Sequence, residues 1–105
     1  MKVVFENKDL LYIYENGKEK GKPTFSKEIV RGFIRKINIL IEVNSTFELT
    51  QFKSLNFEQL KGSLKGFHSV RVNDQYRIIL KINEESDGLS TVEIVEIRQL
   101  TDYHK

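Results

Sequence analysis

Residues 67–82, which read FHSVRVNDQYRIILKI, constrain the fold of this chain more than any other stretch. Phe67–Val72 and Tyr76–Ile82 are rich in β-branched and aromatic residues, and the Asn-Asp-Gln segment between them is typical of a turn. The pattern predicts an antiparallel hairpin with a three-residue loop. Opposed residues in such a hairpin have a constant sum of residue numbers. That sum pairs Val72 with Tyr76, Arg71 with Arg77 and Val70 with Ile78.

The register also decides which side chains share a face, because side chains alternate across a sheet. One face is predicted to carry His68, Val70, Val72, Tyr76, Ile78 and Leu80, and the other Ser69, Arg71, Arg77, Ile79 and Lys81. A two-residue loop would oppose Arg77 to Val70 and mix polar with apolar side chains. The three-residue loop is therefore favoured, and it places both arginines on one face.

A short strand and a helix are predicted at the amino terminus. Lys2–Phe5 reads as the strand, and Lys8–Asn16 as a helix with Asn7 as N-cap and Gly17 just after its end. The buried side of this helix is expected to comprise Leu10, Leu11 and Tyr14. Lys18–Thr24 follows as a loop, because it carries three lysines, a glycine and the only proline.

The strongest helix pattern begins after the N-cap Ser26, where Phe25 is placed to pack against Val30, and runs to about Val43. Its apolar face is expected to comprise Ile29, Val30, Phe33, Ile34, Ile37, Leu40 and Ile41. A polar stripe of Lys27, Arg31 and Arg35, spaced four apart, is interpreted as solvated surface in preference to a binding site.

The remaining segments complete an α+β pattern. Residues 44–59 read as a packed connection with a possible helical turn, anchored by Phe47, Leu49, Phe52, Leu55 and Phe57. Residues 83–90 read as a polar turn, Thr91–Arg98 as a last strand, and residues 99–105 as a short polar tail. The predicted order is β-α-α-β-β-β, with two helices packed on a small curved antiparallel sheet.

The composition excludes several classes of protein. With 105 residues, of which 39% are hydrophobic and 30% charged, the chain is expected to form a single globular domain. It has no cysteine, only two histidines and scattered carboxylates, so neither a disulfide nor a metal site is expected. A Gly-rich phosphate loop, a Ser or Cys nucleophile motif and a dinucleotide fingerprint are absent from the sequence. Without a signal peptide or a membrane-spanning run, a cytoplasmic location is expected.

The charges are segregated along the chain although the formal net charge is only +2. Residues 53–81 contain six basic residues against Glu58 and Asp74, whereas residues 84–96 contain five acidic residues and no basic one. A basic hairpin beside an acidic strand suits a ligand that carries phosphates. An ordinary solvated surface is an equally weighted alternative.

The carboxyl terminus carries groups able to move a proton. Asp102, Tyr103, His104 and Lys105 directly follow the last predicted strand. A phenol or an imidazole beside a phosphate can take or give a proton, and a cation can stabilise the charge of the transition state. The alternative is a frayed terminus without a chemical role.

These segments together resemble the RelE/ParE superfamily of bacterial toxins, and within it most closely the HigB, or plasmid maintenance system killer, branch. The resemblance rests on LKGSLKGFHSVRVNDQYRIILKI, followed by VEIVEI and the terminal DYHK, with FENKDL, YENGK and GKP upstream in the same order. It covers nearly the whole chain and implies one RelE-like domain over residues 1–105. It further implies the toxin of a type II toxin–antitoxin pair, acting as a metal-independent, ribosome-dependent mRNA endonuclease that needs no cofactor.

The resemblance implies specific roles for individual residues and partners. The implied catalytic residues are Lys61, Arg77, Tyr103 and His104, and the implied RNA-binding residues are Lys65, Arg71, Lys81 and Asp102. The implied partners are mRNA in the ribosomal A site and a cognate antitoxin, expected to be a helix-turn-helix protein, with no membrane. Members of the HigB branch often carry a histidine just before the LKG turn, where this chain has Leu-Asn-Phe-Glu-Gln at residues 55–59.

Two other functions stay open at the level of sequence. A ParE-like member would poison DNA gyrase without nuclease activity, and an inactive member would serve only as an interaction domain. The same fold permits all three functions, because function resides in the site. The presence of Lys61, Arg77, Tyr103 and His104 favours the nuclease.

Overall fold

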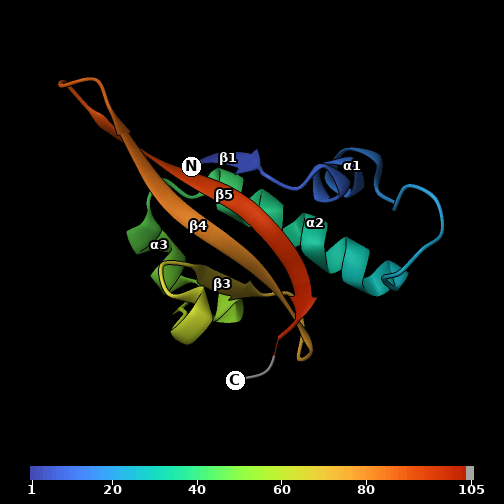
Figure 1. The fold of residues 1–105 in the computed structure, drawn as a ribbon. Coiled ribbons are helices and arrows are strands. Elements are labelled where there is room, and N and C mark those ends of the chain that lie inside the picture. Colours follow the sequence, from blue (N-terminus) through green and yellow to red (C-terminus); the bar gives the residue numbers. More distant parts are fainter. Residues whose placement is uncertain (104–105) are drawn as a thin grey trace.

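A computed structural model describes residues 1–103, which form a mixed α+β fold with helices on a five-stranded sheet (Figure 1). The elements in chain order are β1 (Lys2–Phe5), α1 (Lys8–Asn16), α2 (Lys27–Glu42), α3 (Thr46–Gln51), the 3₁₀ turn η1 (Lys53–Leu55), β2 (Glu58–Gln59), the 3₁₀ turn η2 (Gly62–Leu64), β3 (His68–Arg71), β4 (Tyr76–Ser86) and β5 (Thr91–Asp102). The strand order is β1-β5-β4-β3-β2. The predicted α+β class is confirmed. The sheet differs from the prediction in two respects, since β2 is an additional strand and β1 runs parallel to β5.

The predicted hairpin register is confirmed. Strand β3 pairs with β4 so that Arg71 opposes Arg77 and Val70 opposes Ile78. The Val72 amide donates to the Tyr76 carbonyl at 2.9 Å, which closes the three-residue loop. Within the loop, the Asn73 side-chain oxygen accepts hydrogen bonds from the backbone amides of Gln75 and Tyr76, at 2.9 and 2.7 Å. Asparagine is favoured in turns for this reason.

Helix α2 packs along one face of the sheet and forms the core with it (Figure 1). Phe33, Ile37 and Leu40 are fully buried, and they join the apolar face of the hairpin and the inward side chains of β5. The Ser26 hydroxyl accepts a hydrogen bond from the Ile29 amide at 3.2 Å, as predicted for an N-cap. Ile41 departs from the prediction, because it lies 42% exposed at the end of the helix.

Helix α1 is capped as predicted but is rotated relative to the predicted buried side. The Asn7 side chain accepts hydrogen bonds from the Asp9 and Leu10 amides. Leu10 and Ile13 are the buried residues, whereas Leu11 and Tyr14 are only partly buried. Leu10 and Ile13 are three residues apart, so they lie on the same side of the helix, and this side faces the core.

The connection at residues 44–59 is more ordered than predicted. It contains α3, η1 and β2, and the Ser45 hydroxyl caps α3 by accepting from the Glu48 amide. Leu49 and Leu55 are fully buried, as expected of anchors, but Phe47 is 72% and Phe52 41% exposed. A six-residue helix turns only one side toward the core, so it cannot bury every aromatic residue in this stretch.

Strands β4 and β5 extend well beyond their predicted ends. They stay paired through Ser86 and Thr91, so much of the predicted polar turn is a two-stranded arm that projects from the body (Figure 1). At the other end, Gln99–Asp102 belongs to β5, so most of the predicted tail is strand. At both ends of the β4–β5 pair, the backbone hydrogen bonds between the strands continue into segments whose side chains are polar. No helix among the described residues is long and apolar enough to cross a membrane.

Candidate functional site

The candidate site lies where the β3–β4 turn, β2 and the end of β5 meet. One hollow of about 380 Å³ is lined by Asn56, Glu58, Arg71, Asn73, Asp74, Arg77 and Tyr103. A second hollow of about 310 Å³ is lined by Glu58, Gln59, Leu60, Lys61 and Tyr103. Tyr103 and Glu58 border both hollows. They therefore join Lys61 to the two arginines in one concave surface.

Arg77 is the most enclosed cation of this surface. It is 9% exposed, and its Nε donates to the Ser69 hydroxyl at 2.7 Å while Nη2 donates to the Asn56 carbonyl at 2.5 Å. Burial lowers the pKa of Arg77 and the nearby Arg71 acts in the same direction, whereas Glu58 and Tyr103 oppose them. An arginine stays protonated under such conditions, so the site holds a desolvated positive charge.

Arg71 lies in a different environment although it opposes Arg77 in the sheet. Its side chain is 44% exposed and forms an ion pair with Asp74 in the turn, whose own side chain is 96% exposed. Exposed pairs of this kind are weak. Arg71 can therefore exchange Asp74 for a phosphate at small cost.

Lys61 and Tyr103 come from chain segments that lie far apart in the sequence. Lys61 is exposed just before η2, where Gly62 has a φ of 67° and reverses the chain in a conformation suited to glycine. Tyr103 directly follows β5 and is partly buried. The neighbouring Asp102 accepts a hydrogen bond from the Gln75 side-chain amide at 2.9 Å, which ties the end of β5 to the hairpin turn.

Three of the described site residues predicted from the sequence, Lys65, Lys81 and Asp102, do not line this surface. Lys81 opposes Glu96 across the β4–β5 ladder. The role of these three residues in RNA binding stays a prediction. His104 lies outside the described residues.

His68 is placed on the core side, as the register predicted. Its ring stacks on Phe57 with centroids 4.9 Å apart, and burial lowers its pKa. His68 opposes Leu80, so its side chain lies on the opposite face of the sheet from Arg77. It therefore does not belong to the candidate site.

Sequence reasoning missed Glu58 as a site residue. Glu58 opposes Ser69 in the β2–β3 ladder, so its side chain shares the face of the sheet that carries Arg77. The sequence signal was weak, because a two-residue strand has no visible alternation. Residues 55–59 contain an acidic residue, Glu58, within a stretch whose other charged residues are mostly basic. This was the one sequence feature that pointed to Glu58.

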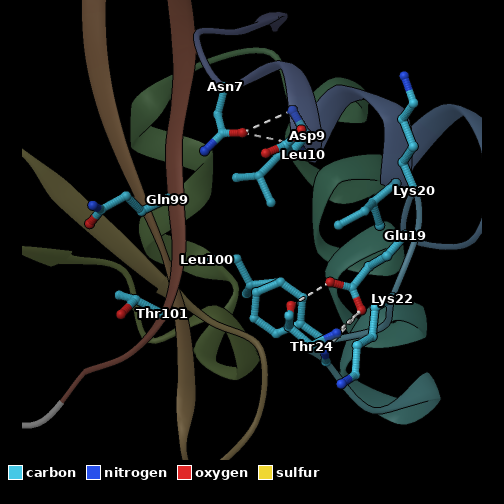
Figure 2. Close-up of a pocket in the computed structure, with 12 residues that line it drawn as sticks. Asn7, Asp9, Leu10, Glu19, Lys20, Lys22, Thr24, Gln99, Leu100 and Thr101 are labelled. Carbon is cyan, nitrogen blue, oxygen red and sulfur yellow. Dashed lines mark hydrogen bonds between the residues drawn. The ribbon is translucent and has the colours of Figure 1, made fainter.

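A separate hollow of about 440 Å³ lies between α1, the loop of residues 18–24 and the end of β5 (Figure 2). The Glu19 carboxylate, which reaches into it, already accepts hydrogen bonds from the Thr24 and Phe25 amides at 2.7 and 2.8 Å. It therefore closes the loop and offers no unused base. None of the predicted site residues within residues 1–103 lines this hollow. Among the residues that the structure describes, no cluster of side chains could hold a metal ion.

Comparison with known proteins identifies the family. Residues 3–94 match the model of the HigB-like toxins, described as the RelE-like toxin of the type II toxin–antitoxin system HigB. The chain is 35% identical over 81 residues to Toxin HigB-1 of Vibrio cholerae serotype O1, covering 77% of this chain and 83% of that protein. The match to the family model includes Lys61 and Arg77 and ends before Tyr103.

Solved structures support the same fold. A YoeB/ParE toxin from Agrobacterium tumefaciens aligns with a TM-score of 0.53 at 17% identity, over 99% of this chain and 100% of that one. A YoeB–YefM complex from Staphylococcus aureus aligns with a TM-score of 0.50 at 20% identity, over 100% and 98%. The chain belongs to the HigB-like family of RelE-like toxins from type II toxin–antitoxin systems.

Proposed function

We propose that this toxin is a metal-independent endoribonuclease that cleaves mRNA on the ribosome. The observation that carries the proposal is the concave surface in which Arg77, Lys61 and Tyr103 meet beside Glu58. Two cations can stabilise the charge that develops on the phosphate, and a phenol and a carboxylate can transfer protons, so these groups can support phosphodiester cleavage without a metal.

The proposed reaction begins when a base removes the proton of a ribose 2′-OH. The 2′ oxygen then bonds to the adjacent phosphorus, and the bond from phosphorus to the 5′ oxygen breaks. The leaving oxygen takes a proton, so the products are a 2′,3′-cyclic phosphate and a 5′-hydroxyl end. In-line geometry and neutralisation of the negative charge supply most of the acceleration.

Each residue of the site has a proposed role. Arg77 and Lys61 stabilise the charge that develops on the phosphorane. Tyr103 and His104 move the protons, with Glu58 as a further candidate for the base because it borders both hollows. Arg71 holds the phosphate backbone, and Asp102 supports that side of the site through Gln75.

The proposed partners follow from the family. The toxin acts in the cytoplasm on mRNA in the ribosomal A site and is neutralised by a cognate helix-turn-helix antitoxin. The solved YoeB–YefM complex is a toxin–antitoxin assembly of a protein with the same fold. A short reading frame for a helix-turn-helix protein beside the toxin gene would support this assignment.

Induction of the protein in growing bacteria tests the proposed reaction. Translation should stop, and primer extension should detect mRNA cut within codons. An Arg77→Ala variant at equal abundance should leave the mRNA intact and is the matched control. Intact mRNA together with double-strand DNA breaks would contradict the nuclease and favour poisoning of DNA gyrase.

A further inference from the structure

The guanidinium of Arg77 is held by groups that have no role in the proposed reaction. Its Nε donates to the Ser69 hydroxyl at 2.7 Å, and its Nη2 donates to the Asn56 carbonyl at 2.5 Å and to the Ser69 carbonyl at 3.4 Å. From this geometry we infer that Ser69 and Asn56 are positioning residues, which hold Arg77 in one orientation for charge stabilisation. The inference rests on the proposed RNA cleavage.

The hydrogen bonds leave one edge of the guanidinium for a ligand. An arginine has five N–H donors, and the single Nε hydrogen and both Nη2 hydrogens are directed to Ser69 and Asn56. Among the described residues, Nη1 has no hydrogen-bond partner. Because Arg77 lines the hollow, Nη1 is the nitrogen that would meet a phosphate oxygen there.

Ser69 directs the cation along the strand and away from Arg71. Arg71 lies directly opposite Arg77, whereas Ser69 lies two residues before Arg71 in β3 and opposes Ile79. Ser69 is fully buried, so its hydroxyl offers a fixed acceptor in a place that water does not reach. The bond to this hydroxyl therefore limits the repulsion between two arginines on one face.

Asn56 contributes through its backbone conformation. It has a φ of 42° and a ψ of 55°, and it is the one non-glycine residue with positive φ in the described part of the chain. Its amide donates to the Lys53 carbonyl at 3.1 Å and ends η1. The left-handed conformation leaves the Asn56 carbonyl within hydrogen-bonding distance of Arg77. Asparagine tolerates this conformation better than most residues do.

A fixed cation should act on the rate more than on affinity. A preorganised charge that needs no reorganisation stabilises the transition state, whereas a mobile charge binds substrate and transition state alike. Loosening Arg77 should therefore lower the maximal cleavage rate and leave half-saturation nearly unchanged. A residue that only supported folding would not produce this separation.

Single-turnover cleavage on translating ribosomes, measured over a range of toxin concentrations, tests the inference. Ser69→Ala should lower the maximal rate about tenfold with half-saturation within about twofold, and Ser69→Thr, which keeps the hydroxyl, should recover most of the rate. Asn56→Ala should lower the rate about fivefold, whereas Asn56→Gly should stay within about twofold, since glycine adopts the left-handed conformation freely. Both Asn56 variants lack the side-chain amide, so the comparison between them depends on the Cβ methyl group of alanine, which disfavours the left-handed conformation.

Ile79→Val is the control, because Ile79 is buried on the same face of the hairpin and makes no bond to Arg77. It should reduce thermal stability without slowing cleavage. The inference is overturned if Ser69→Ala slows cleavage no more than Ile79→Val, or if Asn56→Gly is as slow as Asn56→Ala.

Hydrogen exchange of the Arg77 Nε–H, followed by NMR, separates this inference from the proposed function. The signal should exchange slowly in the wild-type protein and at least about tenfold faster in Ser69→Ala. Exchange as fast as that of the exposed Arg71 would overturn the positioning of Arg77 even if RNA is cleaved. A protected Nε–H in a protein that cuts no mRNA would overturn the proposed function and the catalytic use of the positioning, but not the held geometry.

Discussion

Arg71 and Arg77 oppose each other across one hairpin and share one face of the sheet, yet they differ in almost every physical respect. Arg77 is 9% exposed and bonded to neutral groups, whereas the Arg71 side chain is 44% exposed and paired with Asp74. The difference comes from what lies beside each residue. Strand β2 covers β3 only at His68 and Ser69, so it encloses Arg77 and leaves the turn with Arg71 open. Two arginines that are paired in one ladder therefore suit different roles, Arg77 as a fixed buried cation and Arg71 as an exposed cation that can exchange partners.

Replacement of Arg77 should have the largest effect. Arg77→Ala should reduce the single-turnover cleavage rate by about 10²–10³-fold, the loss typical of removing one preorganised donor. Arg77→Lys should recover little, because an ammonium cannot reproduce the planar set of bonds to Ser69 and Asn56. Cleavage assays on ribosomes programmed with a defined mRNA measure both variants. A lysine variant with nearly wild-type activity would show that charge alone is sufficient.

Tyr103→Phe should have the next largest effect. The ring would still border both hollows, and only the hydroxyl would be lost. If the phenol moves a proton, the maximal rate should fall by about 10²-fold with little change in stability, as measured by cleavage kinetics and thermal unfolding. An unchanged rate would mean that His104 or Glu58, and not Tyr103, transfers the protons. The Glu58→Gln variant tests Glu58 in the same assay.

Arg71→Ala should weaken binding more than catalysis. Loss of one exposed phosphate contact should reduce affinity for ribosome-bound mRNA several-fold and lower the slope of log affinity against log salt by about one. The maximal rate should stay within about threefold of wild type. A rate loss comparable to that of Arg77→Ala would remove the contrast between the two arginines.

A change remote from both arginines should affect stability and not cleavage. Glu93 on β5 accepts a hydrogen bond from the Thr46 amide at 2.9 Å and another from the Thr46 hydroxyl, and these bonds lower its pKa. Glu93→Gln should lower the free energy of unfolding by about 1 kcal/mol at pH 7 and leave the cleavage rate unchanged. Chemical denaturation and the cleavage assay measure the two quantities.

The lowered pKa of Glu93 also gives the sign of a pH dependence. The ionised form makes the favourable bonds, so its contribution is present above the unfolded-state pKa and is lost as the pH falls through the folded-state value. Wild-type and Glu93→Gln proteins should therefore converge in stability under acidic conditions. A difference that persists unchanged at low pH would assign the effect to packing.

Local patterns were sufficient for the elements with strong periodicity. The hairpin register followed from the alternation around a three-residue turn, and the cap and buried stripe of α2 followed from Ser26 and the spacing of its apolar residues. These are properties of neighbouring residues, so they can be read without the rest of the chain. The family motif then indicated Lys61 and Arg77, which the fold brings to one surface together with Tyr103.

Elements without such periodicity were missed or cut short. Strand β2 has two residues, and the β4–β5 arm has water on more of its surface, so neither carries a clear alternation. The burial of Ile13 in place of Leu11 likewise depends on how α1 is rotated against the core. Such details are set by contacts between distant segments.

The sequence by itself determined that two arginines face each other on one side of a hairpin, because the alternation of side chains leaves no other register with an apolar face. Only the tertiary structure decided that one of them is a held, desolvated cation and the other a solvated one. The reason is that Asn56 and Glu58 reach this face through a left-handed turn and a short edge strand, whose placement depends on the whole sheet. Their role in the site could be recognised only after the chain was folded.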